Sequence, residues 1–353
     1  MKDKIGFIAI GQAGGNIGKL FEEKGYTVLY LNTSREDLET LGDAKYTYHI
    51  ADGDGCNKDR GKAKRLVVED FDNISKEIYE KMDVSMVYVV FASGGGTGSG
   101  CGPMLADLLI GDVKENPGHI RNVGVITVIP GDGESVKAHI NCYECFEELT
   151  GIEGIASTLV IDNSRGDKLL LNRSLVNTFC SFLDIPRWCK DKRGNIDRAE
   201  IEETLKARGM LVVSRIPARK SSTASVLESF RNGIFAPIEQ DRVIKYIAIA
   251  SSGDVDISAM QKEVGVPVDV FQTYSDRATT CCLAGLNYPV ARLEQVYQKA
   301  VKHQEQIMRN MQATSGGGMK KGVNFLASAS SQDAEVPRQK GPSRRDLMKK
   351  YMG

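Results

Sequence analysis

Ser93-Gly-Gly-Gly-Thr-Gly-Ser-Gly-Cys-Gly-Pro103 is the stretch around which the rest of this chain is organised. It follows the apolar run Val84 to Ala92 and precedes a helical pattern, Met104 to Ile110, so we expect a strand, a glycine loop and a helix start. Glycines let backbone N–H groups converge on an anion, and a helix N-terminus adds about half a positive charge. Thr97 and Ser99 can add hydroxyl donors. The stretch therefore predicts a phosphate-binding loop rather than a flexible turn.

The composition is that of an ordinary soluble protein with room for one large or two medium cores. Of its 353 residues, 41% are hydrophobic and 26% are charged, and two domains are the default for this length. Residues Lys2 to Ile10 run straight into a strand pattern instead of a signal peptide, and no apolar run approaches the ~18 residues of a membrane span. We therefore expect a cytoplasmic protein with no membrane partner.

The spacing of the cysteines and the distribution of charge give further information on the kind of protein. The eight cysteines include Cys142-x-x-Cys145 and the adjacent Cys281 and Cys282, but no second Cys or His pair at zinc spacing. We expect reduced structural thiols and no metal centre built from side chains. Lys and Arg number 46 against 46 Asp and Glu, yet residues 314–353 hold eight basic and three acidic residues. The body is thus mildly acidic and the tail basic.

Strand and helix patterns alternate through the first half of the chain. This alternation predicts the α/β class, with a doubly wound parallel sheet covered by helices on both faces. Such sheets bind ligands at the carboxyl ends of their strands, where the glycine loops Gly11–Asn16, Asp52–Gly61 and Pro130–Ser135 also lie. The expected strands are Lys4–Ile10, Thr27–Leu31, Tyr46–Ile50, Val84–Ala92, Val123–Ile129 and Thr158–Ile161.

A long amphipathic helix, Leu169 to Asp184, separates this half from a second one and ends near Pro186. Shorter elements follow, which suit a smaller mixed-sheet domain. A stretch rich in Gly, Ser and Ala, Thr314 to Val336, reads as a disordered linker before the basic end Arg338 to Gly353. The expected elements of the second half are a helix at Ile196–Ala207, strands at Met210–Val213, Ile244–Ile249, Val268–Thr273 and Thr280–Leu286, a helix near Ser222–Phe230 and a long helix at Ala291–Met311.

Three other nucleotide or ion motifs are absent or incomplete. The first turn reads Gly11-x-Ala13-x-x-Asn16 and lacks the G-x-G-x-x-G spacing, which disfavours a nicotinamide dehydrogenase. A Walker A sequence appears nowhere. The pair Asp52 and Asp54 hints at a calcium loop, but Cys56 and Ala63 stand where that loop needs ligands.

Several loops together resemble the tubulin/FtsZ superfamily. Gly11-Gln12-Ala13-Gly14-Gly15-Asn16-Ile17-Gly18 is similar to its first nucleotide loop, and Gly94-Gly95-Gly96-Thr97-Gly98-Ser99-Gly100 to its signature loop. The loops at Asn32-Thr33, 53–57, 130–134 and 161–163 resemble the second, third, fifth and sixth. The resemblance covers about residues 1–312. It implies a GTP-binding domain (1–168), a central helix (169–186), a co-catalytic loop and helix (187–207), a smaller mixed α/β C-terminal domain with a long terminal helix (208–312) and a flexible basic tail (313–353).

The resemblance implies a GTPase that holds GTP or GDP with Mg²⁺. The signature loop would hold the α- and β-phosphates, the loop at 55–57 would sense the γ-phosphate, and Glu134 would accept from the ribose hydroxyls. Asn163 and Asn177 would read guanine, and Arg173 stands where relatives carry a stacking aromatic, so its planar guanidinium would stack instead. The implied binding residues are Gly11, Gln12, Ala13, Asn16, Asn32, Gly55, Cys56, Asn57, Gly94, Gly95, Gly96, Thr97, Gly98, Ser99, Glu134, Asn163, Arg173 and Asn177.

The sequence Asn195-Ile196-Asp197-Arg198-Ala199-Glu200 resembles the seventh loop of the superfamily. By that resemblance Asn195, Asp197 and Glu200 are catalytic, and they act in the site of the next subunit of a head-to-tail filament. Asp197 and Glu200 are three residues apart and therefore share one helical face, where they can orient a water. An acidic first helical turn, stabilised by the helix dipole, is the structural alternative.

Within the superfamily, the short acidic helix after Asn32-Thr33-Ser34, the pair Asp162-Asn163 and the long helix before a basic end resemble the plasmid and phage TubZ branch. That branch implies a cytomotive filament that segregates or positions DNA, with a DNA-bound adaptor protein on the tail. Six basic residues after Val336 without interleaved aromatics give a weak signal for direct DNA contact. A static scaffold, a division protein like FtsZ and a nicotinamide dehydrogenase are the alternatives.

Overall fold

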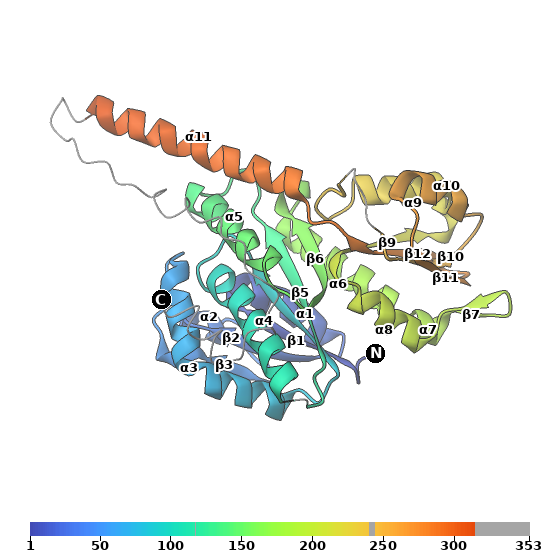
Figure 1. Ribbon diagram of the computed structural model, residues 1–353, viewed down its shortest axis with the longest axis horizontal. Coiled ribbons are helices and arrows are strands. Elements are labelled where there is room, and N and C mark those ends of the chain that lie inside the picture. The colour runs from blue at the N-terminus through green and yellow to red at the C-terminus, as the bar shows by residue number, and fades with distance from the viewer. Residues whose placement is uncertain (117, 240–243, 315–353) are drawn as a thin grey trace, which may run out of the picture.

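The structure is a computed structural model that describes residues 1–116, 118–239 and 244–314 (Figure 1). One ten-stranded sheet runs through both halves of the chain in the order β11-β10-β12-β9-β6-β5-β4-β1-β2-β3. The predicted α/β class is confirmed. The predictions for the linker and the basic end, residues 315–353, lie outside the described residues.

The first six strands are all parallel, as the alternation predicted. Phe7 of β1 pairs in register with Val28 of β2 and Tyr88 of β4, so the most apolar strands lie at the centre of this half. Every residue of β1 and β6 is buried, as expected for a parallel sheet with helices on both faces. The strands are β1 (Ile5–Ile10), β2 (Thr27–Asn32), β3 (Thr47–His49), β4 (Met86–Ala92), β5 (Asn122–Ile129) and β6 (Ile155–Asp162).

The helices of this half follow the strands in turn. They are α1 (Gly11–Glu23), α2 (Arg35–Glu39), α3 (Arg60–Lys81), α4 (Thr97–Glu115), α5 (Val136–Thr150) and the central α6 (Lys168–Leu183). Helix α1 packs with α6, whereas α3 and α5 both pack against α4. Phe179 of α6 meets Tyr88 of β4 edge to face with ring centroids 5.5 Å apart, which fixes the central helix on the sheet.

Two glycine stretches that the sequence placed in loops are largely helical. Helix α1 begins at Gly11 itself, and α4 begins at Thr97, inside the opening stretch. The glycines are needed there because the first helical turns lie against other backbone. A Cβ on Gly14, for example, would lie 2.4 Å from the Val90 carbonyl oxygen.

The second half adds four strands to the same sheet instead of forming a sheet of its own. β9 (Gly209–Pro217) pairs in parallel with β6 through Ser157↔Gly209 and Thr158↔Met210. This pairing covers an edge of β6 that would otherwise be open. β12 (Ala278–Leu286) is antiparallel to both β9 and β10 (Tyr246–Ser251), and β11 (Asp269–Tyr274) is parallel to β10. The expected mixed arrangement is thus present, and the proposed domain boundaries stay a prediction.

The remaining elements flank this part of the sheet. They are α7 (Ile185–Trp188), the hairpin of β7 (Lys190–Asp191) and β8 (Gly194–Asn195), α8 (Arg198–Lys206), α9 (Thr223–Arg231), α10 (Ile257–Val264) and α11 (Val290–Thr314). Helix α10 was not predicted, although Asp256 caps it. Helix α11 crosses back over α5 and extends beyond the sheet (Figure 1). In the described part of the chain, no helix is both long and apolar enough to cross a membrane.

Candidate functional site

A cavity of about 740 Å³ lies at the carboxyl ends of β1, β4, β5 and β6. Fourteen of the predicted binding residues line it together: Gly11, Gln12, Ala13, Asn16, Gly55, Cys56, Asn57, Gly94, Gly95, Gly96, Thr97, Gly98, Glu134 and Asn163. Residues from five separate loops therefore meet at one place, which is the edge where parallel sheets bind ligands.

Two helix N-termini contribute to the wall of this cavity without side-chain caps. Ile10 and Gly96 occupy the N-cap positions of α1 and α4, and neither helix has a side-chain hydrogen bond at its cap. Helices α2, α3, α5 and α6, by contrast, are capped by Ser34, Asp59, Ser135 and Asp167. The first N–H groups of α1 and α4 are therefore left for a ligand, and the helix dipoles favour an anion there.

The loops around the cavity are tied to one another by hydroxyl contacts. The Thr33 hydroxyl lies 2.8 Å from the Thr97 hydroxyl and 3.3 Å from the Cys56 thiol. Gly11 has a φ of 69°, the left-handed region that favours glycine. The Thr33 contacts hold the end of β2 against the start of α4 and the loop at Cys56.

The loop before α3 carries backbone strain. Asn57 and Lys58 both have left-handed φ angles, 42° and 59°. For a residue with a Cβ this conformation costs about 1–2 kcal/mol, so the surrounding contacts must hold it in place. Gly96 lies directly against this loop, because a Cβ at position 96 would lie 2.7 Å from both the Cα and the nitrogen of Lys58. Only glycine at position 96 lets the two loops approach this closely.

Two lysines on the cavity wall were not predicted. Lys58 lines it, with its Nζ donating to the Ser135 hydroxyl at 2.6 Å, and Lys168 lines it with its Nζ 2.9 Å from Glu134 Oε1. Burial raises the pKa of Glu134, but hydrogen bonds from Lys168 and the Gly131 N–H outweigh burial and lower it. Glu134 is therefore ionised at neutral pH, and it forms part of the cavity wall.

Four predicted binding residues do not line the cavity. Asn32 is buried and shapes the turn into α2, because its Oδ1 accepts from the Ser34 N–H and its Nδ2 donates to Asp37. Ser99 is buried, with its hydroxyl donating to the Gly95 carbonyl at 2.5 Å. Arg173 and Asn177 lie on the exposed side of α6.

Other residues of the same elements occupy the wall. Asn172 lines the cavity with Lys168, four residues before it on the same face of α6. The i, i+4 spacing of two polar residues at the start of an apolar helix is the signal that could have found them. The lining residues that were not predicted are Ile10, Ile17, Ser34, Asp37, Lys58, Ala92, Val128, Pro130, Lys168, Leu169 and Asn172.

A second cleft lies beside the β7–β8 hairpin and shares no lining residue with the cavity. Asn195 and Asp197 line it, along with Pro186, Asp191, Lys192, Ile196 and Arg198. The hairpin is fixed to β11, because Arg193 stacks on Tyr274 at 3.9 Å and Thr273 donates to the Gly194 carbonyl. Hydrogen bonds from Arg193 lower the pKa of Asp191 to about 2.

Asp197 and Glu200 form a capping box at the start of α8. The Asp197 carboxylate accepts from the Glu200 N–H at 3.0 Å, and the Glu200 carboxylate accepts from the Asp197 N–H at 2.8 Å. The two side chains are thus held on one face of the helix. Each carboxylate uses one oxygen in the box, Asp197 Oδ1 and Glu200 Oε2.

A buried ion pair joins α11 to the end of β6, beside the cavity. Arg292 of α11 donates to Asp162, the last residue of β6, at 2.7 and 3.2 Å, and lies 3.4 Å from Asp132. Burial raises the pKa of Asp162, but Arg292 and the Ser164 N–H outweigh burial and lower it. The Asp162 side chain also caps the turn that carries Asn163 into the cavity.

The cysteines lie in the interior of the protein. All eight are free and buried. Burial raises the pKa of Cys142 to about 12, so this thiol is protonated at neutral pH. Across residues 1–116, 118–239 and 244–314, no group of three or more His, Cys, Asp or Glu side chains could hold a metal ion.

Comparisons with known proteins agree with this architecture. The family model "Tubulin/FtsZ family, GTPase domain" matches residues 4–169. Tubulin-like protein TubZ of Clostridium botulinum C phage is 29% identical over 293 residues, which are 81% of this chain and 80% of that protein. Tubulin-like protein CetZ of Pyrococcus abyssi is 25% identical over 277 residues, 71% of this chain and 72% of that protein.

Solved structures give the same result. The crystal structure of Clostridium botulinum phage c-st TubZ superposes with a TM-score of 0.78 at 25% identity, over 87% of this chain and all of that one. A GTPγS-form protofilament of Bacillus thuringiensis serovar israelensis TubZ gives a TM-score of 0.74 at 16% identity, over 89% of this chain and 95% of that one, and shows the shared fold. Residues 4–169 of this chain therefore form a GTPase domain of the Tubulin/FtsZ family.

Proposed function

We propose that this protein is a filament-forming, cytomotive GTPase of the TubZ type that segregates or positions plasmid or phage DNA in the cytoplasm. The observation that carries the proposal is that the phosphate-binding groups and the predicted catalytic residues lie at two separate sites on the subunit. The cavity has the anion-binding groups, while the predicted catalytic residues Asn195 and Asp197 line another cleft and Glu200 pairs with Asp197 at the start of α8. In this proposal, the nucleotide site of one subunit is therefore completed by the catalytic residues of a neighbouring subunit.

In this proposal the cavity holds GTP or GDP. The two uncapped helix N-termini, the glycine backbone and Lys58 suit the phosphates, and the Glu134 carboxylate suits the ribose hydroxyls. Asn163 and Asn172 lie at the wall with amide groups that can read a base edge. Arg173 and Asn177 remain predictions for this role, although their side chains lie on the exposed side of α6.

Mg²⁺ fits such a site as a companion of the phosphates rather than as a protein-held ion. It would neutralise charge on the transferred phosphoryl group. The wall offers Asp37 and Glu134 as carboxylates, and Glu134 is already paired with Lys168. The residues therefore fit an ion bound through phosphate and water oxygens.

Hydrolysis in this proposal is completed by the next subunit. Asp197 Oδ2 and Glu200 Oε1 are the oxygens that the capping box leaves for a water. When α8 docks over the cavity of a neighbour, these carboxylates would orient and polarise the water that attacks the γ-phosphate, and Asn195 would border the same place. Turnover would then require polymer.

The relatives support the proposal that this protein forms filaments. The DNA that such filaments would move has to be identified by experiment. The TubZ of Bacillus thuringiensis forms a two-stranded filament and the Haloferax volcanii CetZ2 a GTPγS-bound protofilament. For this chain we propose head-to-tail filaments and a DNA-bound adaptor protein on the C-terminal tail, with weak direct DNA contact by the tail's basic residues.

The test combines assembly with imaging. Light scattering and phosphate release after addition of GTP should rise together in the wild-type protein. In live cells, fluorescent filaments should exchange subunits and move a labelled replicon, and a chain truncated after residue 314 should form filaments that no longer move it. Persistent filaments without subunit exchange would favour the static scaffold or a division protein. Binding of NADH without GTP would contradict the proposal as a whole.

A further inference from the structure

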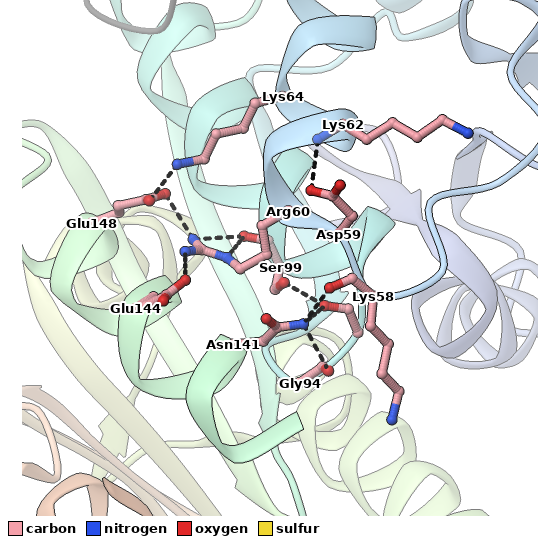
Figure 2. A network of polar contacts seen from close by, with 11 residues as sticks. Lys58, Asp59, Arg60, Lys62, Lys64, Gly94, Ser99, Asn141, Glu144 and Glu148 are labelled. Atoms are coloured by element: carbon pink, nitrogen blue, oxygen red, sulfur yellow. Dashed lines mark hydrogen bonds and ion pairs between the residues drawn. The ribbon is translucent and has the colours of Figure 1, made fainter. Parts of the chain in front are cut away.

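Asn141 of α5 connects the two loops that approach each other at the cavity. Its side chain is buried, with 4% of its surface exposed. Its amide nitrogen lies 2.9 Å from the Gly95 carbonyl oxygen, 3.1 Å from that of Lys58 and 3.5 Å from that of Gly94 (Figure 2). One side chain on a helix thus donates to both glycine-lined loops at once.

The Lys58 carbonyl belongs to the strained loop, and the Gly95 carbonyl to the stretch that begins α4. A Cβ at Gly96 would lie 2.7 Å from Lys58, so nothing can be inserted between these two backbones. Asn57 and Lys58 have unfavourable left-handed φ angles, which persist only when surrounding contacts keep the backbone in place. Asn141 lies behind the contact and bridges it.

Helix α5 reinforces the same arrangement at other points. Lys137 Nζ donates to the Asn57 carbonyl at 3.2 Å, and Lys58 Nζ donates to the Ser135 hydroxyl. The buried guanidinium of Arg60 donates to the Ser99 carbonyl and pairs with Glu144 and Glu148 of α5, each at 2.9 Å (Figure 2). The lysine contacts are exposed and on long side chains, so the buried Asn141 is the stiffest of the connections to the strained loop.

Loss of Asn141 would not affect the two loops equally. The Gly95 carbonyl also accepts from the Ser99 hydroxyl, so it keeps a donor. Among the described residues, Asn141 provides the side-chain donor to the Lys58 carbonyl. The first loop would therefore stay in place while the loop at 55–58 would relax from its strained conformation.

We propose that Asn141 is a positioning residue that holds the loop at 55–58 in the conformation that recognises the γ-phosphate, and so makes the cavity discriminate GTP from GDP. This inference rests on the proposed function, which places the γ-phosphate beside that loop. Asn141 itself does not line the cavity. It acts through the Lys58 carbonyl, and its removal should change the selectivity for the third phosphate more than nucleotide binding as such.

The experiment compares the affinities of the full-length chain for GTPγS and for GDP, at protein concentrations below the onset of polymer. Asn141→Asp keeps the side-chain volume but replaces the donor by an acceptor that faces the carbonyl oxygens of Lys58, Gly94 and Gly95. We expect its GTPγS affinity to fall about tenfold and its GDP affinity to fall less than about threefold. Asn73→Ala is the control, because it removes an amide hydrogen bond to Asp70 on α3 away from the cavity.

A second variant and a second measurement distinguish the proposed effect from a general loss of folding. Asn141→Ala should show the same direction with a smaller ratio, and amide hydrogen exchange in residues 55–59 should become faster while exchange in residues 94–99 changes little. Equal losses for both nucleotides, or a wild-type ratio together with unchanged exchange, would overturn the role of Asn141. A wild-type chain that binds neither nucleotide would instead overturn the proposed function, and the two failures are thus distinguishable.

Discussion

The cavity above the sheet and the cleft beside the β7–β8 hairpin differ in the groups that they offer. The cavity has uncapped helix N-termini, glycine backbone and two lysines, so it suits a polyanion. The cleft is lined by Asp191 and Asp197 together with Lys192 and Arg198, so its charges balance, and it offers carboxylates at the start of α8 rather than a binding place for a polyanion. Within one subunit the two places share no residue.

This difference explains why neither place alone resembles a complete hydrolase site. The carboxylates of Asp197 and Glu200 have a local task, since each accepts from the backbone of the other. A capping box of this kind is worth about 1 kcal/mol to a helix and needs no catalytic reason. Variants that keep the capping box but change the charge distinguish capping from catalysis.

The largest effect is expected for Glu200→Gln. Glutamine retains the capping box, because its side-chain oxygen still accepts from the Asp197 N–H, but it removes the charge that polarises water. We expect GTP turnover to fall about 1,000-fold while filaments still form and the melting temperature is unchanged. Glu202→Gln on the same helix is the matched control and should keep full turnover. Normal turnover by Glu200→Gln would assign the residue to capping alone.

The second effect concerns the support of the cavity by α11. Arg292→Met removes the partner of Asp162, which is 1% exposed, and leaves that carboxylate buried without a counter-charge. We expect a loss of about 3 kcal/mol in the free energy of unfolding by denaturant. Arg309→Met, which breaks an exposed i, i+4 pair with Glu305 on the same helix, should cost less than about 0.5 kcal/mol. Similar small losses for both would show that the buried pair contributes little.

The third effect is steric. Gly96→Ala places a methyl group against the Lys58 backbone and should push the two loops apart, at a cost of about 2 kcal/mol in stability or in nucleotide binding. Gly133→Ala is the control, because a Cβ there meets nothing within 4 Å. Calorimetric titration with GDP separates the two variants. Equal affinities would mean that the loops do not need their close approach.

The smallest effect is the pH dependence of stability. The pKa of Asp162 is lowered below its ordinary 3.8, so its ionised form is favoured by folding. That contribution is fully present above about pH 3.8 and is lost as the pH falls through the lowered value. The gap in unfolding free energy between the wild type and Asp162→Asn should therefore shrink by about 1 kcal/mol between about pH 6 and pH 3. A gap that does not change with pH would contradict this.

Much of the fold could be predicted because its signals are local. The alternation of apolar runs and amphipathic stretches predicted where the first six strands lie along the chain, and the short helix α2 begins directly after Ser34 as expected. The continuity of the sheet from β6 to β9 could not be predicted, since two residue pairs leave no pattern in the sequence. The start of α1 at Gly11 was missed because glycine usually indicates a turn.

The candidate site shows the same limit. Loops identified by glycine patterns converge as expected, because backbone path follows from the strand order. The direction of a helical side chain depends on the rotation of the helix, which packing decides. Asn172 therefore faces the cavity where Arg173 was expected. Lys58 and Lys168 were missed since single lysines in polar loops carry no motif.

The most direct test of the central claim is the dependence of GTP turnover on protein concentration. Phosphate release per subunit and sedimented polymer should be measured in parallel across the onset of assembly. If the site is completed by a neighbour, turnover per subunit should be near zero below the onset and rise in proportion to polymer above it. The same turnover per subunit in solutions without polymer would show that a single subunit completes the chemistry, and would contradict the account.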